Sequence, residues 1–256
     1  MLRSAPERQH RILEILNGRE YAKNTDLARH LKVTAMTVWR DLFEMEEKGL
    51  VRRSRGRVSR SDSSIIEPDF LTKADVAAAA KSRIAAYAAR HLICEGDSLA
   101  LDGGTTVAAI ARETLPAGLT ILTNSLHTAR LFMNHPARPA VYASGGLLRE
   151  QSGTFIGREA LTFFSRRRTV RYFLSATGVD AVAGVTDLTL EDNEVKQAMA
   201  SGTREVVLLA DRSKFGVTSL MRVLPWRRVH RLVTEAPSGL LRLIRLSHTH
   251  VRIHRV

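Results

Sequence analysis

The stretch LKVTAMTVWRDLFEMEEKGLVRR, residues 31–53, decides the fold of the first part of the chain. We expect a short turn at residues 32–33 and a helix N-cap at Thr34, whose hydroxyl can accept a bond from the first helical turn. Apolar residues then recur at helical spacing, which predicts a helix with a buried side formed by Val38, Leu42 and Met45. Gly49 ends this helix, and an extended segment begins at Leu50.

Two shorter helices precede this stretch. The first ends near Asn17-Gly18 and has an apolar stripe of Ile12, Leu13, Ile15 and Leu16. The second follows the cap candidates Asn24 and Thr25, with inward residues Leu27, Ala28 and Leu31. After the third helix, a basic β-wing is indicated around Gly56 by Arg52, Arg53, Arg55 and Arg57. Three helices and a wing form an arrangement that binds DNA.

The third helix is then the recognition helix, whose early outward residues meet base edges in the major groove. Arg40 can form a bidentate bond to guanine, whereas Thr34 or Thr37 can bond a phosphate. Met36 or Trp39 can touch a thymine methyl or a sugar. The open alternative is an exposed amphipathic helix with Trp39 packed against its neighbour. The predicted DNA-binding residues are Thr34, Ala35, Met36, Thr37, Trp39, Arg40, Arg53, Arg55 and Arg57.

The composition favours a polyanionic partner and a reducing compartment. The 256-residue chain has a formal net charge of +13, and clustered Lys and Arg bind phosphate backbones by displacing counterions, although a basic solvated surface is the open alternative. Cys94 is the single cysteine, which excludes an internal disulfide and a cysteine-rich zinc site. We expect no metal and no cofactor. A signal-peptide core and an uncharged membrane-length stretch are both lacking, so we expect a cytoplasmic protein.

Beyond residue 95 the pattern changes to short apolar runs alternating with helical stretches, which is typical of βαβ units. The segment between the two patterns, SRGRVSRSDSSIIEPDF, is polar and rich in Ser and Arg. We therefore predict an α/β protein in which a winged helix-turn-helix, residues 1–57, is followed by a linker, residues 58–72. A larger domain with an open, mostly parallel sheet follows at residues 73–256.

A glycine loop in the second domain is a candidate phosphate site. SLALDGGTTVAAIARETL, residues 98–115, is typical of a strand, a loop and a helix. Backbone N–H groups at a helix N-terminus and the hydroxyls of Thr105 and Thr106 can donate to an anion, and Gly103 and Gly104 permit close approach. The open alternative for the same residues is an ordinary tight turn between strand and helix that is capped by threonines.

Polar residues also follow four other predicted strands: LTILTNS, AVYASGG, YFLSATGVD and VVLLADRSKFG. In a parallel sheet the carboxyl ends lie along one edge, where ligands bind, so these residues should converge on one crevice. Lys214 would complement a phosphate, and Asp102, Asn124 and Asp180 could bond hydroxyls. A structural role in capping the next turn stays open for Asp102 and Asp211.

The sequence resembles the DeoR family of bacterial repressors along almost its whole length. The matching motifs, in family order, are ERQHRILEIL, LARHLKVTAMTVWRDLFEMEEKGLVRR, LALDGGTTVAAIA, LTILTNS, SGGLLR, ATGVDAVAGVT and LLADRSKFG. The chain departs from the family at Trp39-Arg40, where two arginines are usual, and at Arg55-Gly56-Arg57, where the wing is usually Gly-Gly. The tail from Leu240 onward does not align.

The resemblance implies a C-terminal domain similar to the sugar-phosphate isomerase fold, adapted for sensing. It carries Glu194 and Lys196 into the candidate site. Together with the strand-end pattern, it gives the effector-site candidates Asp102, Gly103, Gly104, Thr105, Thr106, Thr123, Asn124, Ser125, Gly145, Gly146, Gly178, Asp180, Glu194, Lys196, Asp211 and Lys214.

We therefore predict a DNA-binding transcriptional regulator, a repressor of a carbohydrate-metabolism operon whose operator binding responds to a phosphorylated sugar. A homo-oligomer, dimer or tetramer, would match a palindromic or repeated operator. The alternative is a sugar-phosphate isomerase with a DNA-binding appendage, using Asp180, Glu191, Glu194 and Lys196 for proton transfer. An isomerase does not need the fused winged helix, so we expect no enzyme activity.

Overall fold

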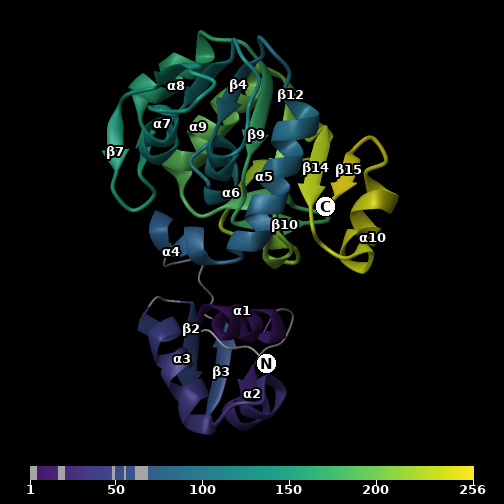
Figure 1. Ribbon diagram of the computed structural model, residues 1–256. Coiled ribbons are helices and arrows are strands. Elements are labelled where there is room, and N and C mark those ends of the chain that lie inside the picture. The colour runs from purple at the N-terminus through teal and green to yellow at the C-terminus, as the bar shows by residue number, and fades with distance from the viewer. Residues whose placement is uncertain (1–4, 17–20, 48–49, 55, 61–68) are drawn as a thin grey trace. The chain divides into compact units, whose positions relative to one another are not determined.

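The computed structural model describes residues 5–16, 21–47, 50–54, 56–60 and 69–256. The chain divides into two compact units, Met1–Ala77 and Ala78–Val256, and each is described by itself (Figure 1). Within the described ranges, no helix combines the length and the apolar character needed to cross a membrane.

In the N-terminal unit, three of the four described helices, α1 to α3, pack against a three-stranded antiparallel sheet with strand order β1-β3-β2. Its elements are α1 (Ala5–Leu16), β1 (Ala22–Lys23), α2 (Asn24–Leu31), α3 (Ala35–Glu47), β2 (Val51–Ser54), β3 (Arg57–Arg60) and α4 (Phe70–Asp75). The core consists of side chains that helical spacing placed inward, among them Ile12, Leu16, Leu27, Leu31, Val38, Leu42 and Met45. The three predicted helices and their buried faces are confirmed.

The caps of the predicted helices are partly confirmed. Thr34 caps α3, because its Oγ1 accepts a bond from the Thr37 amide at 3.2 Å. The prediction that Asn24 and Thr25 precede α2 is wrong, since α2 begins at Asn24 and Lys23 occupies the N-cap without a side-chain bond. Instead, the backbone N–H of Asn24 donates to the Gly56 carbonyl at 3.0 Å. The wing therefore satisfies a donor at the helix N-terminus that a capping side chain would otherwise bond.

The wing consists of β2 and β3, joined by a turn in which Gly56 has φ +76°. β3 extends to Arg60, beyond the predicted domain end at residue 57, and α4 begins at Phe70, inside the predicted linker of residues 58–72. Three predicted features lie outside the described residues: the helix end at Asn17-Gly18, the stop at Gly49 and the wing residue Arg55.

The C-terminal unit is built on a seven-stranded sheet in which every adjacent pair is parallel, with strand order β15-β14-β12-β9-β4-β5-β6. These strands are β4 (Ser98–Leu101), β5 (Thr120–Thr123), β6 (Ala140–Ala143), β9 (Thr169–Leu174), β12 (Thr203–Leu209), β14 (Arg231–Thr234) and β15 (Arg252–Arg255). The predicted α/β class, with an open parallel sheet after a winged helix-turn-helix, is confirmed.

Two smaller sheets flank this one, β7-β8 and β10-β11-β13. Their strands are β7 (Leu147–Arg149), β8 (Thr154–Ile156), β10 (Gly178–Asp180), β11 (Gly184–Asp187) and β13 (Met221–Leu224). The helices of the unit are α5 (Ala78–Leu92), α6 (Thr105–Ala108), α7 (Leu126–Phe132), α8 (Arg158–Ser165), α9 (Leu190–Ser201) and α10 (Ser238–Ser247). Short 3₁₀ turns are η1 (Ala109–Arg112), η2 (Arg212–Lys214) and η3 (Trp226–Arg228).

Helices cover both faces of the large sheet because its central strands are apolar on both sides. On β9, Phe173 joins the cluster that contains Ile84 of α5, whereas Tyr172 and Leu174 join the cluster that contains Val195 of α9. The basic tail that did not align forms α10 and the edge strand β15, which pairs with β14.

The strand order reverses between β4 and β9. From β4 the chain adds β5 and then β6 on one side, and from β9 it adds β12, β14 and β15 on the other. In open parallel sheets, ligands bind outside the carboxyl ends of the strands at such a switch point. The residues that follow these two strands, Asp102 and Ser175, therefore mark the place where a site is expected.

Candidate DNA-binding surface and effector site

The outward face of α3 presents most of the side chains predicted to read bases. Met36 is 69% exposed and Trp39 is 49% exposed. Ala35 and Arg40 are also exposed, and Arg40 forms no ion pair within the described part of the chain. Thr37 is half-buried and shares a hydrogen bond of 2.9 Å with the Thr34 hydroxyl, so both hydroxyls serve the start of the helix.

An ion pair that the sequence reasoning missed ties α3, the predicted recognition helix, to α1. Asp41 is buried on the inner face of α3 and accepts two bonds from Arg8 of α1, at 2.7 Å from Nε and 2.9 Å from Nη2. This bonding raises the pKa of Arg8. The position of Asp41, three residues after Val38 on the apolar stripe, was the available signal that its carboxylate would need a partner.

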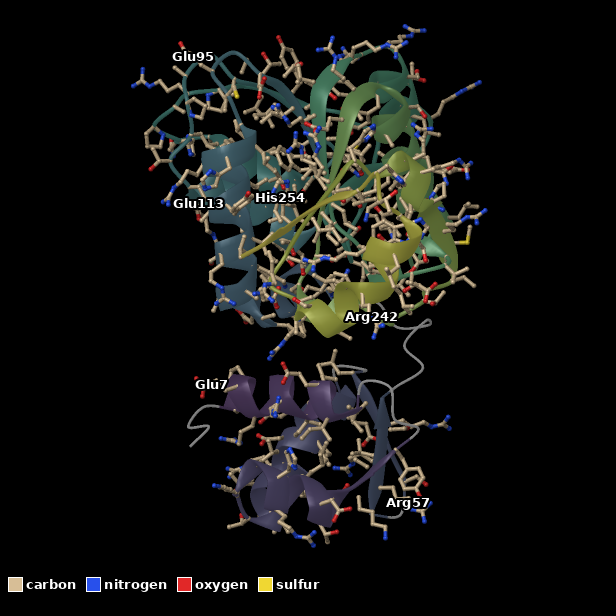
Figure 2. The ribbon with its side chains drawn as sticks, turned by 90° about the vertical axis from the view of Figure 1, so that its right-hand side faces the viewer. Glu7, Arg57, Glu95, Glu113, Arg242 and His254 are labelled. Carbon is tan, nitrogen blue, oxygen red and sulfur yellow. The ribbon has the colours of Figure 1, made fainter. Side chains whose placement is uncertain are left out.

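Two of the wing arginines, Arg53 and Arg57, contact aromatic rings of their own unit. The Arg53 guanidinium lies 5.2 Å from the Trp39 ring centroid and pairs with Glu46 at 2.9 Å. The Arg57 guanidinium lies 4.4 Å from the Tyr21 ring centroid, and Figure 2 shows Arg57 on the outside of the N-terminal unit. The Arg53 head group is therefore engaged within the protein.

In the C-terminal unit, Asp102 is fully buried at the switch point and joins β4 to β9. Its carboxylate accepts bonds from the Ser175 amide at 2.8 Å and the Ser175 hydroxyl at 3.0 Å. It also accepts from the Gly104 amide at 2.9 Å, and the ammonium of Lys196 lies 3.5 Å away. One amide of the glycine loop is thus bonded to the protein itself, and the helix that follows, α6, is only four residues long.

Lys196 forms a buried ion pair with Asp187, a residue that the sequence reasoning did not select. Burial acts to raise the pKa of Asp187, but the charge of Lys196 and the hydroxyl of Thr177, at 2.6 Å, outweigh it and lower that pKa to about 2. Burial acts to lower the pKa of Lys196, and the charges of Asp187 and Asp102 raise it overall. Lys196 is therefore a fixed cation at neutral pH.

A second polar group that the sequence reasoning missed centres on Asp192 of α9. Its carboxylate accepts bonds from Thr154 at 2.6 Å, Thr189 at 3.0 Å and Arg149 at 3.2 Å. Helix phase was the available signal. Asp192 and Lys196 share the side of α9 that buries Val195 and Met199, whereas Glu191 and Glu194 are exposed.

Of the three polar residues that follow the apolar part of β5, two form structural hydrogen bonds and one has a buried oxygen without a partner among the described residues. Thr123 donates to the Leu101 carbonyl at 2.7 Å, and Ser125 caps α7 by accepting the Thr128 amide at 3.1 Å. Asn124 donates to the Phe155 carbonyl at 3.3 Å, but its Oδ1 is buried without a hydrogen-bond partner in the described structure. Such an oxygen is costly unless something bonds it.

Several predicted site residues have structural reasons for their identity. A Cβ on Gly103 would lie 2.1 Å from Thr154 Cγ2, and one on Gly104 would lie 1.8 Å from Ser175 Oγ. Neighbouring side chains therefore occupy the space beside these glycines in which an anion was expected. Gly146, with φ +109°, and Gly145, with φ +66°, form the turn after β6. Gly178 packs against the Val217 carbonyl.

Asp180 does not lie at the end of a strand of the large sheet. It ends β10, where its carboxylate accepts bonds from the Val182 amide at 2.8 Å and the Ala183 amide at 2.6 Å and so stabilises the hairpin turn. Its carbonyl accepts the indole N–H of Trp226 at 2.8 Å. The prediction that it follows the same strand as YFLS is wrong, because β9 ends at Leu174 and the chain then enters a separate sheet.

Asp211 and Lys214 lie after β12, on the same edge of the sheet as Asp102 and Asn124. Asp211 is buried and caps η2 by accepting the Ser213 amide at 2.9 Å, while its Oδ2 has no hydrogen-bond partner among the described residues. Burial acts to raise the pKa of Asp211, and the charge of Lys214 contributes most to lowering it overall. The remaining candidates, Thr105 and Thr106, begin α6.

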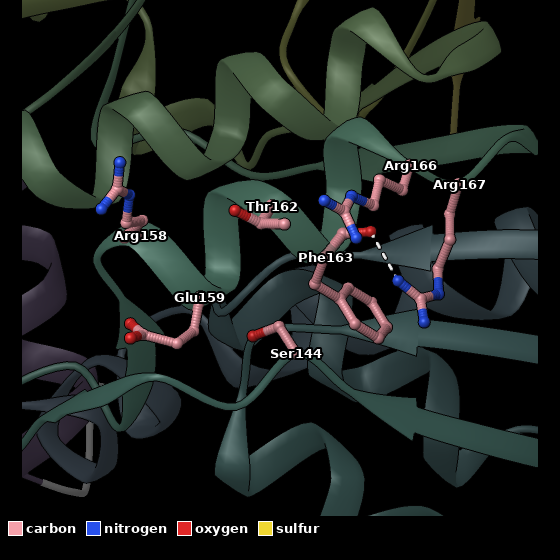
Figure 3. A pocket seen from close by; sticks show the side chains of 7 residues that line it. All are labelled: Ser144, Arg158, Glu159, Thr162, Phe163, Arg166 and Arg167. Carbon is pink, nitrogen blue, oxygen red and sulfur yellow. Dashed lines mark hydrogen bonds between the residues drawn. The ribbon is translucent and has the colours of Figure 1, made fainter.

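A separate hollow of about 630 Å³ lies along α8 and contains none of the predicted effector residues. Figure 3 shows its lining, in which Arg167 donates to the Phe163 carbonyl at 2.9 Å. The residues that line it are Ser144, Arg158, Glu159, Thr162, Phe163, Arg166 and Arg167.

A winged helix-turn-helix joined to a parallel sheet with polar residues at its switch point defines the class of DNA-binding regulators with a separate sensing unit. Family models support both parts: the DeoR-like helix-turn-helix domain matches residues 8–64, and the DeoR C-terminal sensor domain matches residues 76–236. The chain belongs to the DeoR family and is a DNA-binding transcriptional regulator.

Two relatives and one solved structure illustrate the similarity. The chain is 30% identical to the glycerol-3-phosphate regulon repressor of Escherichia coli, over 96% of this chain and 97% of the relative. It is 32% identical to the lactose phosphotransferase system repressor of Staphylococcus aureus, over 82% of this chain and 84% of the relative. A ribose 5-phosphate isomerase from Methanocaldococcus jannaschii aligns at a TM-score of 0.38 with 17% identity, over 52% of each chain.

Proposed function

We propose that this regulator is a repressor of a carbohydrate-metabolism operon and that a small phosphorylated sugar bound at the switch point changes its affinity for DNA. The carrying observation is the set of buried polar groups at one edge of the sheet, in which Asn124 Oδ1 and Asp211 Oδ2 have no partner among the described residues. Two relatives are repressors of a glycerol-3-phosphate regulon and of a lactose phosphotransferase system, which supports an effector of this class.

The charges at the site favour a ligand with both hydroxyl and phosphate groups. Asn124 and Asp211 offer acceptor oxygens to sugar hydroxyls, and Lys214 adds a cation at the same edge of the sheet for a phosphate. Lys196 is already neutralised by Asp187 and Asp102, so it orders the site and contributes little net charge to a ligand.

The same geometry argues against catalysis. General acid–base catalysis needs a group with a pKa near neutrality within reach of the substrate. Lys196 holds its proton, Asp180 is bonded in a hairpin turn, and Glu194 is exposed on α9. We propose that the protein senses a sugar phosphate without converting it, and that it acts in the cytoplasm as a homo-oligomer on a palindromic or repeated operator.

A thermal-shift panel on the full-length protein tests the sensor function. A ligand that binds only the native state, at about 100 times its Kd, stabilises that state by about 2.7 kcal/mol. Phosphorylated sugars are compared with their unphosphorylated counterparts, and a hit is then added to a DNA-binding assay. A rise in melting temperature restricted to a phosphorylated sugar, with a change in DNA affinity, supports the proposal. Melting curves that no phosphorylated sugar shifts would refute it.

A further inference from the structure

The DNA-facing helix carries a stripe of exposed apolar side chains. Met36, Trp39 and Phe43 are 69%, 49% and 41% exposed and are spaced three and four residues apart, so they lie along one side of α3. The stripe begins in the first turn, which is the part of a recognition helix that meets base edges. Exposed apolar patches on a folded surface commonly mark a binding site.

The indole of Trp39 is held in one orientation. It stacks on Phe43 with ring centroids 5.5 Å apart and an interplanar angle of 19°. The Arg53 guanidinium lies over both rings, 5.2 Å from the Trp39 centroid and 5.6 Å from the Phe43 centroid. A cation over aromatic faces attracts them, which restricts the motion of the rings.

Arg53 is itself fixed by Glu46, at the far end of α3. Its Nε lies 2.9 Å from Glu46 Oε2, and its backbone amide donates to Glu46 Oε1 at 2.9 Å. The wing strand β2 is thereby tied to the recognition helix through one side chain. Trp39 is ordered before DNA arrives, so DNA binding does not have to supply the free energy of ordering it.

An ordered indole edge suits one feature of the major groove. Tryptophan has a single N–H donor and no acceptor, so it cannot form the paired bonds that read guanine or adenine. The thymine 5-methyl group is the apolar feature of the groove, and side-chain carbon contacts recognise it. Since Arg53 is engaged with Glu46 and the rings, its contribution to DNA binding acts through Trp39.

We propose that Trp39 determines operator specificity by contacting thymine 5-methyl groups and that Arg53 is the positioning residue that holds its ring. This inference rests on the DNA-binding function of the protein. Arg53, which the sequence predicted to bind DNA, does not contact DNA in this proposal.

The test begins with a random-sequence library of 30-bp double-stranded DNA, from which the full-length protein selects its preferred site. Each thymine of that site is then replaced by uracil, which removes only the 5-methyl group. At one or more positions the wild-type protein should lose affinity about fourfold, the effect of returning one methyl group to water. Trp39→Ala should bind the thymine and uracil sites equally.

Arg53 is tested with two variants. Arg53→Ala should reduce the preference for thymine, and Arg53→Lys, which keeps a cation near the rings, should restore part of it. Tyr142→Ala is the matched control, because Tyr142 is an aromatic residue of similar exposure, 52%, in the other unit. The Tyr142→Ala variant should prefer thymine over uracil as strongly as the wild-type protein does. Melting temperatures of all variants show whether they fold.

Two results would overturn the inference. One is a wild-type protein that tolerates uracil at every position of its selected site; the other is a Trp39→Ala variant that keeps the full preference for thymine. A preference unchanged in Arg53→Ala would remove Arg53 from its positioning role. If the wild-type protein enriches no sequence at all, the DNA-binding function fails and the inference fails with it.

Discussion

Gly103 lies so close to Thr154 that a Cβ added to the glycine would be 2.1 Å from Thr154 Cγ2, whereas Thr154 Cβ would be 3.6 Å away. The first distance is a clash and the second is ordinary contact. The glycine loop after β4 and the strand β8 are therefore fitted to each other through a single methyl group. This contact links the edge strand pair β7-β8 to the switch point.

Gly103→Ala should destabilise the protein, and Thr154→Ser should rescue it. Overpacking a rigid contact costs about 1–3 kcal/mol. Serine lacks the methyl group but keeps the hydroxyl that bonds Asp192 at 2.6 Å, so the double variant should recover most of the loss. Chemical denaturation of the four proteins gives the coupling energy. Equal losses in the single and double variants would contradict the packing argument.

The buried pair of Asp187 and Lys196 should make stability depend on acid pH. The folded pKa of Asp187 is about 2, below its ordinary value of 3.8, so its contribution is present above pH 4 and is lost as the pH falls toward 2. The shift corresponds to about 2 kcal/mol. Denaturation of wild type and Asp187→Asn across this range should give curves that converge at low pH.

The control for this experiment is Asp75→Asn, at an exposed position of α4. Its stability should run parallel to that of the wild type between pH 4 and pH 2. At neutral pH, Asp187→Asn should lose about 2 kcal/mol, because Lys196 keeps its charge with one partner fewer. A variant that is as stable as the wild type at pH 7 would show that the pair does not support the fold.

The spacing of apolar residues predicted the architecture well, because the order of strands and helices depends on patterns within short segments of the sequence. Alternating apolar runs and helices specify a parallel sheet, and the residues after β4, β5 and β12 follow from where the runs stop. The basic tail gave no such pattern, since β15 is a short edge strand with arginines at both ends, Arg252 and Arg255. Pairing with β14 specifies it as a strand, and that pairing is not visible locally.

The site was predicted less completely because its partners come from distant segments. Asp102 was selected from its own loop, but two of its partners, Ser175 and Lys196, lie more than 70 residues away. Asp180 was placed on the large sheet because nothing local marks the break after Leu174. Helix phase on α9 distinguishes Asp192, on the buried side, from Glu194, which is exposed.

Asn124→Ala should remove the response to effector with little loss of stability. The substitution deletes one weak bond, to the Phe155 carbonyl at 3.3 Å, and also deletes an oxygen that is buried without a partner in the described structure. The net cost should stay near 1 kcal/mol. The thermal shift caused by the active phosphorylated sugar should disappear, while Asn134→Ala, in an exposed turn, should keep it. A normal shift in Asn124→Ala would place the ligand elsewhere.

Arg40→Ala should weaken binding to the selected DNA site by about 1–3 kcal/mol, the range for losing a bidentate contact to guanine. Arg40 is exposed and forms no ion pair with any described residue, so the melting temperature should be unchanged. Arg40→Lys keeps the charge but not the paired donors, so it should lose specific affinity while retaining binding to random DNA. Arg112→Ala, in the other unit, controls for net charge. If both Arg40 variants bind the selected site as tightly as the wild type, Arg40 does not read a base and Trp39 would have to account for specificity without it.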